Sequence, residues 1–416
     1  MRRIMIGLVA LTALVVCVAQ ASAQDVTSLF ARHMESGRYA EAERDFAQLT
    51  ERNPRDAGAR MALGMIQFAR AIERLGQGLH RYGLVPPRQS FIPILRLPVP
   101  ENSRPEKLDY DKLRAVYLTF LADLTRAEAT LAAMPEGEVK LPIDILKIRF
   151  DFNGDGQASP DESLIAIMQR MATMPGQPAT AMNMDAKWEV AFDRADATWL
   201  RGYCNVMSAF LEFVLAYDWR DSFAAAGHLF FTGARDPSNP AHAAGEATAQ
   251  FGRDSGTIAD VVAMIHLVRW PLAEPVRMQR ARQHLKQVVA LSRQNWREIL
   301  AETDDDREWL PGPQQKNSAI TALRVTQERI DGWMMTLDEF EAVIDGRKLL
   351  PHWRYTKGID FRAVFDQPTP FDLVLWFTGH AAVPYLKDGE VLSQARVRDI
   401  QTMFGGNFAG YAFWFN

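Results

Sequence analysis

The sequence predicts a mainly α, multi-helical protein. Several long segments place apolar side chains every three or four positions, which is the period of a helix with one buried face. Prolines gather in the segments between them, where they would interrupt a helix. With 48% apolar and 24% charged residues, the 416-residue chain has enough apolar side chains to bury a substantial core.

Residues 1–23 have the pattern of a secretory signal peptide. Arg2 and Arg3 precede the apolar run IGLVALTALVVCVA, and the small residues of ASAQ follow it. The run is too short to span a bilayer with margin. We therefore expect cleavage after Ala23 and a periplasmic or secreted protein without a transmembrane segment in the mature chain. A buried N-terminal helix is the alternative.

Charge and cysteine content argue against several classes of function. Loss of Arg2 and Arg3 changes the formal charge from −4 to −6, whereas nucleic acid and anionic lipid, as main partners, require clustered Lys and Arg. Once Cys17 has left with the signal, Cys204 is the single cysteine, so neither an intrachain disulfide nor a cysteine zinc site is expected. The apolar neighbours of Cys204 predict that its thiol is buried.

Residues 24–80 are expected to form a helical hairpin. Apolar residues at helical spacing run through this segment, broken by Gly37 and by NPRD. Over residues 26–73 the segment resembles a tetratricopeptide repeat, in which Gly37, Tyr39, Ala42, Phe46 and Pro54 match the family's packing positions and turn proline. The match covers one repeat and the first helix of a second. We expect a hairpin that docks on its neighbours; a groove for a protein or peptide partner is the alternative.

The next two segments differ sharply in proline content. Residues 81–107 contain six prolines and are expected to form an extended crossing rather than a helix. Residues 108–175 begin with an amphipathic segment of about seven helical turns. A short helix is then expected after Pro142, leading into a polar loop.

The distribution of tryptophan predicts a separate C-terminal region. All ten Trp lie between Trp188 and Trp414, which suggests two regions with different cores and a seam at residues 174–185. Residues 186–416 are expected to be helical, with a few short strands or irregular segments after Gly346. Abundant Trp in such a region is expected to anchor its core.

The stretch DFNGDGQASPDE, residues 151–162, contains the strongest chemical motif. Calcium takes six to eight oxygen ligands, so a short loop must turn several oxygens toward one point. The stretch resembles the 12-residue EF-hand loop, with glycine at the sharp turn of position six. The resemblance implies a Ca²⁺ site with these ligands: Asp151, Asn153, Asp155, Gln157 through its carbonyl, and Glu162 as a bidentate carboxylate.

A turn followed by a helix cap would explain part of the same stretch. Ser159 and Glu162 have the spacing of a capping box, and Pro160 stands where helices accept proline. That interpretation leaves the side chains of Asp151, Asn153 and Asp155 unexplained, because their charges would repel without a cation. Ala158 replaces the usual branched residue and no second loop follows, so we expect a weak structural site rather than a sensor.

Two other polar features are weaker. The acidic run ETDDDREW, residues 302–309, lacks a glycine to turn it around an ion and is expected to be a helix end with a solvated loop. Asp196 falls on an apolar helix face near Arg194 and Arg201, which suggests an ion pair or an acid–base group.

Two functions remain open. The first is an exported calcium-binding protein that acts as a structural or binding module. The alternative is a calcium-dependent cell-envelope hydrolase, with a groove in the Trp-rich region and buried carboxylates such as Asp196 as acid or base. The zinc, nucleophile-elbow, P-loop and dinucleotide motifs are absent from the sequence, so an enzyme is the less favoured of the two.

Overall fold

The computed structural model describes residues 26–85, 97–172, 188–236, 238, 255–316, 318, 325–404 and 408–415. The predicted signal peptide, the central part of the Pro-rich crossing and the predicted seam lie outside these residues. The prediction of a mainly α fold is confirmed. A first helix covers residues 26–36, and the labelled helices are α2 Tyr39–Arg52, α3 Ala57–Arg81, α4 Tyr110–Ala132, α5 Leu164–Ala172, α6 Arg194–Ala216, α7 Arg220–Phe230, α8 Ser255–Leu267, α9 Pro275–Ala301, α10 Gln327–Ile344, α11 Phe361–Asp366, α12 Leu373–Thr378, α13 Gln394–Met403 and α14 Phe408–Phe415.

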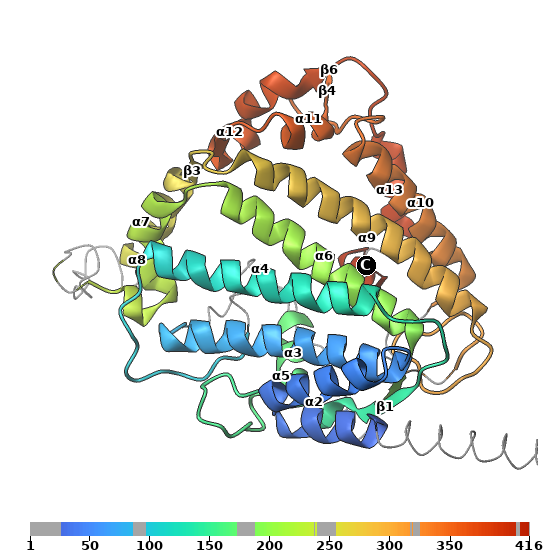
Figure 1. Ribbon diagram of the computed structural model, residues 1–416. Helices are drawn as coiled ribbons and strands as arrows, with labels where there is room; N and C mark the ends of the chain where they lie inside the picture. The colour runs from blue at the N-terminus through green and yellow to red at the C-terminus, as the bar shows by residue number, and fades with distance from the viewer. Residues whose placement is uncertain are drawn as a thin grey trace, which may run out of the picture.

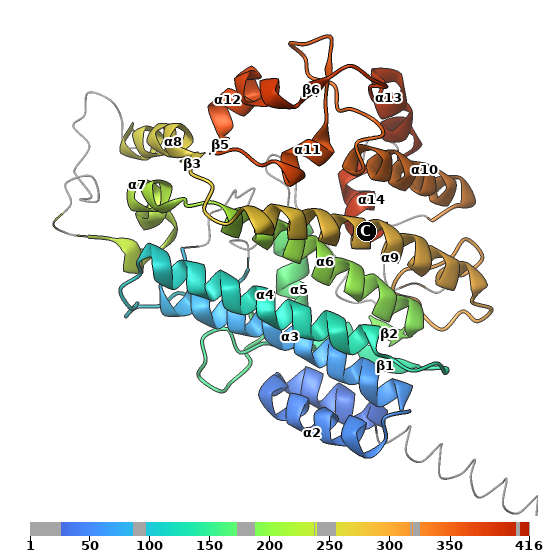
Figure 2. The same cartoon turned by 45° about the horizontal axis from the view of Figure 1, so that its top comes forward.

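Four long helices, α3, α4, α6 and α9, form successive layers (Figure 1, Figure 2). Neighbouring layers are antiparallel, because the start of each helix lies beside the end of the next. On α3 and α4, Gly64 lies against Leu131 and Gly78 against Val116. Helices α10 to α13 lie beyond α9, on the side away from α3. The stack gives each long helix two faces to bury, which accounts for their many apolar positions.

The N-terminal helices lie where helical spacing predicts them, and α3 extends to Arg81, well beyond the end of the repeat-like segment. Asp56 caps α3 by accepting a hydrogen bond from the Ala59 amide (2.9 Å). The described part of the crossing comprises residues 81–85 and 97–107; α3 ends within it at Arg81, and residues 97–107 contain no helix or strand. Asp109, just beyond the crossing, caps α4.

Short antiparallel pairs of strands join the helices. The strands are β1 Leu141–Asp144, β2 Glu189–Phe192, β3 Arg269–Trp270, β4 Gly358–Ile359, β5 Phe371–Asp372 and β6 Leu386–Lys387, paired as β1–β2, β3–β5 and β4–β6. The helix expected after Pro142 was wrong: β1 and a 3-10 turn, Ile145–Lys147, occupy that segment. Leu141 and Ile143 alternate inward and pair with Phe192 and Val190, so tertiary pairing decides the conformation.

One core joins the two halves of the chain. The largest cluster of buried apolar side chains extends from Val26 through Phe152 and Trp188 to Phe415. The expectation of separate cores was therefore wrong, because the N-terminal helices and the Trp-rich region bury their faces against each other. Trp296 and Trp333 are buried in this core as expected of anchors, whereas Trp353 is 76% exposed. Cys204 is buried, as predicted.

Within the described residues, no helix combines the length and the apolar character needed to cross a membrane.

Charged side chains link the layers at their interfaces. Arg277 of α9 donates to Glu212 of α6 (2.8 Å) and to Glu274 (2.7 Å). Both Arg277 and Glu212 are buried, so each needs the other to offset the cost of leaving water. Further along the same interface, the His284 ring contacts the Asn205 side-chain oxygen (2.8 Å).

We predict that Arg277→Ala destabilises the fold by about 3–5 kcal/mol, because Glu212 would remain buried without its partner. Urea unfolding followed by circular dichroism measures the change. Arg280→Ala is the control on the same helix, since Arg280 is half exposed and lies 3.9 Å from Glu212; we expect it to cost less than about 1 kcal/mol. Equal losses in the two variants would contradict the role of the Glu212–Arg277 pair.

Candidate metal centre

The loop over residues 151–162 is curled around its own acidic side chains. Asp151 accepts hydrogen bonds from the amides of Gly154 (2.8 Å), Asp155 (3.0 Å) and Gly156 (3.0 Å). Gly154 and Gly156 have φ values of +74° and +81°, which other residues rarely adopt. The glycines thus let the backbone wrap around the Asp151 carboxylate.

Asn153 and Asp155 continue the same pattern. The Asn153 side-chain oxygen accepts from the Asp155 amide (2.8 Å), and Asp155 accepts from the Gln157 amide (2.7 Å). The Asn153 amide group also donates to Asp155 Oδ2 (3.0 Å), so these two side chains lie together. Asp155 and Gln157 are exposed, which leaves this side of the loop open to solvent.

Glu162 forms the floor of the loop. Its side chain is fully buried, and its two oxygens accept from the amides of Phe152 (2.8 Å), Asn153 (3.1 Å) and Ser159 (3.2 Å). These bonds tie the two ends of the loop to one carboxylate. The hydrogen bonds of Asp151 and Glu162 also offset part of their mutual repulsion, so the convergence of acids does not by itself require a cation.

The surroundings of the loop differ from a helix–loop–helix. The helix expected to begin at Ser159 was misplaced, because α5 begins at Leu164 and Ser163 accepts from the Ala166 amide (3.2 Å). An antiparallel bridge between Arg149 and Ser163 closes the loop, with Phe150 donating to the Glu162 carbonyl (2.7 Å). The loop therefore projects from a narrow extended neck.

Helix α3 supports the loop from below. Asp151 donates its amide to Glu73 (3.1 Å), and Gln77 donates to the Asp151 carbonyl (2.8 Å). Between them, Gly76 leaves the space that the buried Phe152 ring occupies: a Cβ there would lie 2.2 Å from the ring. The spacing of three and four residues places all three contacts on one face of α3.

Glu73 is a site residue that sequence motifs did not identify. Glu73 is buried on the same face of α3 as Ile66 and Ala69, so a carboxylate on an apolar helix face was the available signal. Burial raises the pKa of Glu73 to about 7, and the charges of Asp151 and Glu162 act in the same direction. The hydrogen bond from the Asp151 amide lowers the pKa of Glu73 in part.

The N-terminal hairpin holds the other side of the loop. The Tyr39 hydroxyl donates to the Arg149 carbonyl (2.6 Å), and the Tyr39 ring packs on Phe150. Gly37, at φ +67°, lies so close to Ala158 that a Cβ would approach it to 2.9 Å. Two residues that carry the repeat-like resemblance, Gly37 and Tyr39, thus contact the loop.

Among the residues that the structure describes, the acids at the loop form no ion pair. No described Lys, Arg or His nitrogen lies within the 4.0 Å of an ion pair from any of five carboxylates. These are Glu73, Asp151, Asp155, Asp161 and Glu162. The more distant charge of Arg70 lowers the pKa of Glu73 in part. The described residues thus concentrate acidic groups around the loop without a paired cation.

A second acidic cluster lies between α6 and the end of α9. Asp193, Glu302 and Glu308 place carboxylate oxygens within 4.8 Å of one another, and no other described group of three or more His, Cys, Asp or Glu does so. The loop carboxylates are more widely spaced by this criterion. Asp193 and Glu308 are buried, so the expectation of a merely solvated loop at residues 302–309 was wrong for part of that run.

Lys140 neutralises this second cluster. Its ammonium nitrogen lies 2.6 Å from Asp304, 3.7 Å from Asp193 and 3.9 Å from Asp306. Burial alone would lower the pKa of Lys140, but the hydrogen bond with Asp304 and the charges of Glu308 and Asp193 raise it. Lys140 thus places a positive charge beside Asp193, one of the three members of this cluster.

Burial raises the pKa of Glu302 to about 8, with the charge of Asp193 acting in the same direction. Burial also raises the pKa of Glu308 to about 7, although Lys140 lowers it in part. Part of the cluster is therefore protonated at neutral pH, which reduces the repulsion between its members.

Asp196 belongs to the same cluster rather than to an ion pair with arginine. Arg194 donates to the carbonyls of Pro135 and Gly137, and Arg201 pairs with Glu128. Asp196 instead accepts from the Asp193 amide (2.9 Å) in a reciprocal capping box at the start of α6. Burial raises the pKa of Asp196 well above its usual value, and Asp193 adds to the effect. The expected Asp196–Arg pair was wrong.

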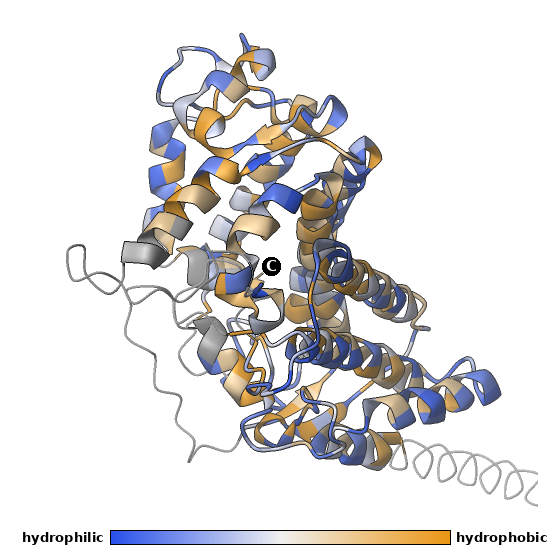
Figure 3. Cartoon of the chain, turned by 90° about the vertical axis from the view of Figure 1, so that its left-hand side faces the viewer, coloured by the Kyte–Doolittle hydropathy of each residue, from blue (hydrophilic) through white to orange (hydrophobic). Residues whose placement is uncertain are grey.

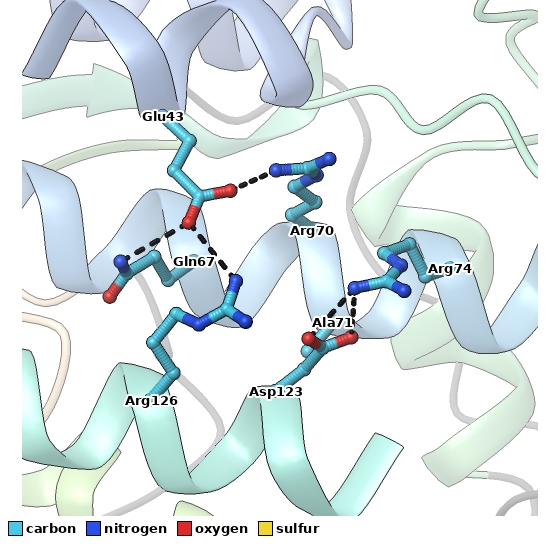
Figure 4. Close-up of a pocket in the computed structure, with 7 residues that line it drawn as sticks. All are labelled: Glu43, Gln67, Arg70, Ala71, Arg74, Asp123 and Arg126. Atoms are coloured by element: carbon cyan, nitrogen blue, oxygen red, sulfur yellow. Dashed lines mark hydrogen bonds and ion pairs between the residues drawn. The ribbon is translucent and has the colours of Figure 1, made fainter. Parts of the chain in front are cut away.

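Cavities lie apart from both acidic clusters. One small space between α2, α3 and α4 is filled by charged groups, with Arg70 and Arg126 on Glu43 and Arg74 on Asp123 (Figure 4). A larger cavity of about 180 Å³ has aromatic walls and no carboxylate among its lining residues. Its lining residues are Phe213, Tyr217, Phe361, Val364, Thr369, Phe371, Trp376 and Tyr385.

Comparison with known proteins identifies no relative. No protein-family model, curated protein or solved structure matches this chain. Assignment of a function therefore depends on the chemistry of the two acidic clusters.

We predict that stability falls as pH rises between about 4.5 and 8 in calcium-free buffer. Glu302 binds its proton in the folded state up to about pH 8, whereas its ordinary pKa is 4.5. In that window the folded state holds more protons than the unfolded state, so raising the pH favours unfolding. The carboxylates with lowered pKa, such as Glu43 and Asp345, change stability only below the window.

Thermal melting in EDTA at intervals across that window measures this dependence. We expect Glu302→Gln to flatten the decline in melting temperature, because the variant has no proton to lose. Glu51→Gln removes an exposed acid of α2 and should leave the slope as in the wild type. An unchanged slope in Glu302→Gln would show that the buried cluster does not titrate in this range.

Proposed function

We propose that this chain is an exported calcium-binding protein with a single EF-hand-type site, serving as a structural or binding module rather than a sensor. The observation that carries the proposal is the cluster of five carboxylates around the loop without a cationic partner among the described residues. The second acidic cluster provides the contrast, because Lys140 already supplies its positive charge. A divalent cation would supply the corresponding positive charge at the loop.

The chemistry of the loop suits calcium. Carboxylate, amide and carbonyl oxygens are the ligands of a hard cation, and those of Asp151, Asn153, Asp155, Gln157 and Glu162 would hold the ion. Backbone amides fix four of these side chains in position, so less ordering remains when an ion binds. Asp151 Oδ1 and Glu162 Oε1 each accept two hydrogen bonds. The second oxygen of each, Asp151 Oδ2 and Glu162 Oε2, accepts one hydrogen bond and so retains a lone pair for the metal.

The loop's contacts suggest what calcium would do. The loop joins Gly37 and Tyr39 of the hairpin to Glu73 and Gln77 of α3. An ion at the loop would reduce the repulsion between Asp151 and Glu73 and so favour this junction. A single site without a partner loop fits an affinity of about 10⁻⁴ to 10⁻³ M, typical of extracellular modules.

Export supports the same proposal from the sequence. The basic, apolar and small-residue order of residues 1–23 resembles that of a signal peptide, which would direct the mature chain to the periplasm or outside the cell. A weak site would be filled there more readily than in a calcium-poor cytosol. The hydrolase alternative lacks a corresponding observation, because the aromatic cavity has no carboxylate in its walls.

We predict that calcium raises the melting temperature of the mature protein. A hundredfold excess of calcium over the Kd would stabilise the folded state by about 2.7 kcal/mol if the ion binds that state only. Calorimetric titration gives the stoichiometry, for which we expect one ion per chain. Asp151→Asn and Asp155→Asn should each weaken binding by on the order of tenfold or more, since each removes one of the site's few charged ligands.

The matched controls are Glu302→Gln and Glu308→Gln, which remove carboxyl groups from the second cluster without touching the loop. Both should bind calcium as the wild type does. Absence of heat and of any melting shift at 10 mM calcium, or loss of binding in the controls alone, would overturn the proposal.

A further inference from the structure

Exposed apolar side chains are concentrated at one end of the molecule. Sixteen large apolar residues among those described are exposed, and nine of them lie in the segments 261–265 and 353–383. We call these nine the α8–α12 face. They are Val261, Val262, Ile265, Trp353, Leu373, Val374, Leu375, Phe377 and Val383.

The two segments form one surface. β3 pairs with β5, and the Leu373 amide donates to the Val268 carbonyl (3.0 Å), so α8 and α12 leave this small sheet side by side. Both helices lie toward the left of Figure 1, and Figure 3 shows the molecule from that side, coloured by hydropathy. The face is therefore continuous rather than a set of isolated side chains.

The exposed side chains described on helices α8 and α12 are mostly apolar. On α8, the successive residues Val261, Val262 and Ala263 are all exposed, as is Ile265, beside the exposed His266. On α12, Leu373, Val374 and Leu375 are exposed, while Trp376 lines the aromatic cavity. Exposed apolar side chains gathered in this way mark a surface that contacts a partner or a membrane.

An aromatic tip extends this face. Trp353 and Phe377 are each 76% exposed. The Trp353 indole N–H donates to the Phe377 carbonyl (3.2 Å), so its one polar group is already bonded and the outward ring is apolar. His352 stacks on Trp353 and packs against Tyr355. Tryptophan and tyrosine in such a setting are typical of the boundary between lipid and water.

The charge beside the tip is positive. Arg354 is exposed, donates to the Thr378 carbonyl (2.8 Å), and has no carboxylate within ion-pair distance among the described residues. Lys357 and Arg269 are exposed as well, each paired with one aspartate. His266 and His380 are exposed at this end as well. A negatively charged surface would provide an ionic partner for the Arg354 guanidinium.

We propose that the α8–α12 face docks on the surface of a lipid bilayer that contains anionic lipids. At 13 and 6 residues, α8 and α12 are too short to span a bilayer, so the chain would lie at the interface with its apolar side chains among the upper acyl groups. The net acidity of the chain does not oppose this docking, because attraction to a membrane surface acts within about a Debye length of the contact.

Flotation of the full mature chain with vesicles tests the proposal. The vesicles are phosphatidylcholine alone, or phosphatidylcholine with 30% phosphatidylglycerol, both in EDTA so that calcium at the loop cannot bridge protein and lipid. We expect binding to the mixed vesicles. The double variant Trp353→Ser, Phe377→Ser should weaken it by on the order of tenfold or more, since each ring loses its burial in lipid.

Two further variants separate the contributions. Arg354→Gln should weaken binding to the anionic vesicles by about fivefold, which corresponds to about 1 kcal/mol for one cation near the membrane surface. Binding to the neutral vesicles should not change. Val276→Ser, Leu300→Ser is the control, because it removes exposed apolar side chains of α9 outside the face.

Three results would overturn the proposal. The first is no flotation with either vesicle, and the second is equal binding by the wild type and the Trp353, Phe377 variant. The third is a wild-type dimer in light scattering that the same variant converts to a monomer, which would assign the face to a second copy of the chain. Because calcium is absent throughout, failure here leaves the calcium proposal standing.

Discussion

A buried carboxylate must share a proton, meet a cation or accept several hydrogen bonds, and this requirement shapes the centre of the fold. The protein meets it in different ways at two places. Around Asp193 and Glu302, raised pKa values and Lys140 provide protons and a cation from the chain itself. Around Glu162, backbone amides provide hydrogen bonds, and no side-chain cation approaches among the described residues.

The two clusters also lie at the points where distant segments meet. The loop brings the N-terminal hairpin, α3 and the start of α5 together through Tyr39, Gln77 and Glu162. The Lys140 cluster joins the segment before β1 to the start of α6 and the chain after α9. Apolar contacts fill the core between them, while the charged groups fix which segments meet. The pairing of charged groups therefore helps to determine which segments of the chain lie together.

Features that depend on local order along the chain could be predicted from the sequence. The helical period located the long helices, and the glycines at positions 154 and 156 indicated the turn of the loop. Features that depend on a contact with a segment far along the chain could not be predicted in this way. Leu141–Asp144 became a strand because Glu189–Phe192 lies beside it, far along the chain. Glu73, Lys140 and Asp196 acquired their roles from neighbours that no local pattern specifies.

Lys140 has one more consequence. Because Lys140 is part of the chain, its positive charge accompanies the acidic cluster in every compartment. The Lys140 cluster can therefore form whatever ions the surrounding medium contains. The described residues give the loop no such internal supply, and under the proposed function its last counterion comes from the compartment. The strength of the junction at Tyr39 and Glu73 would then follow the calcium concentration around the protein, whereas that of the Lys140 cluster would not.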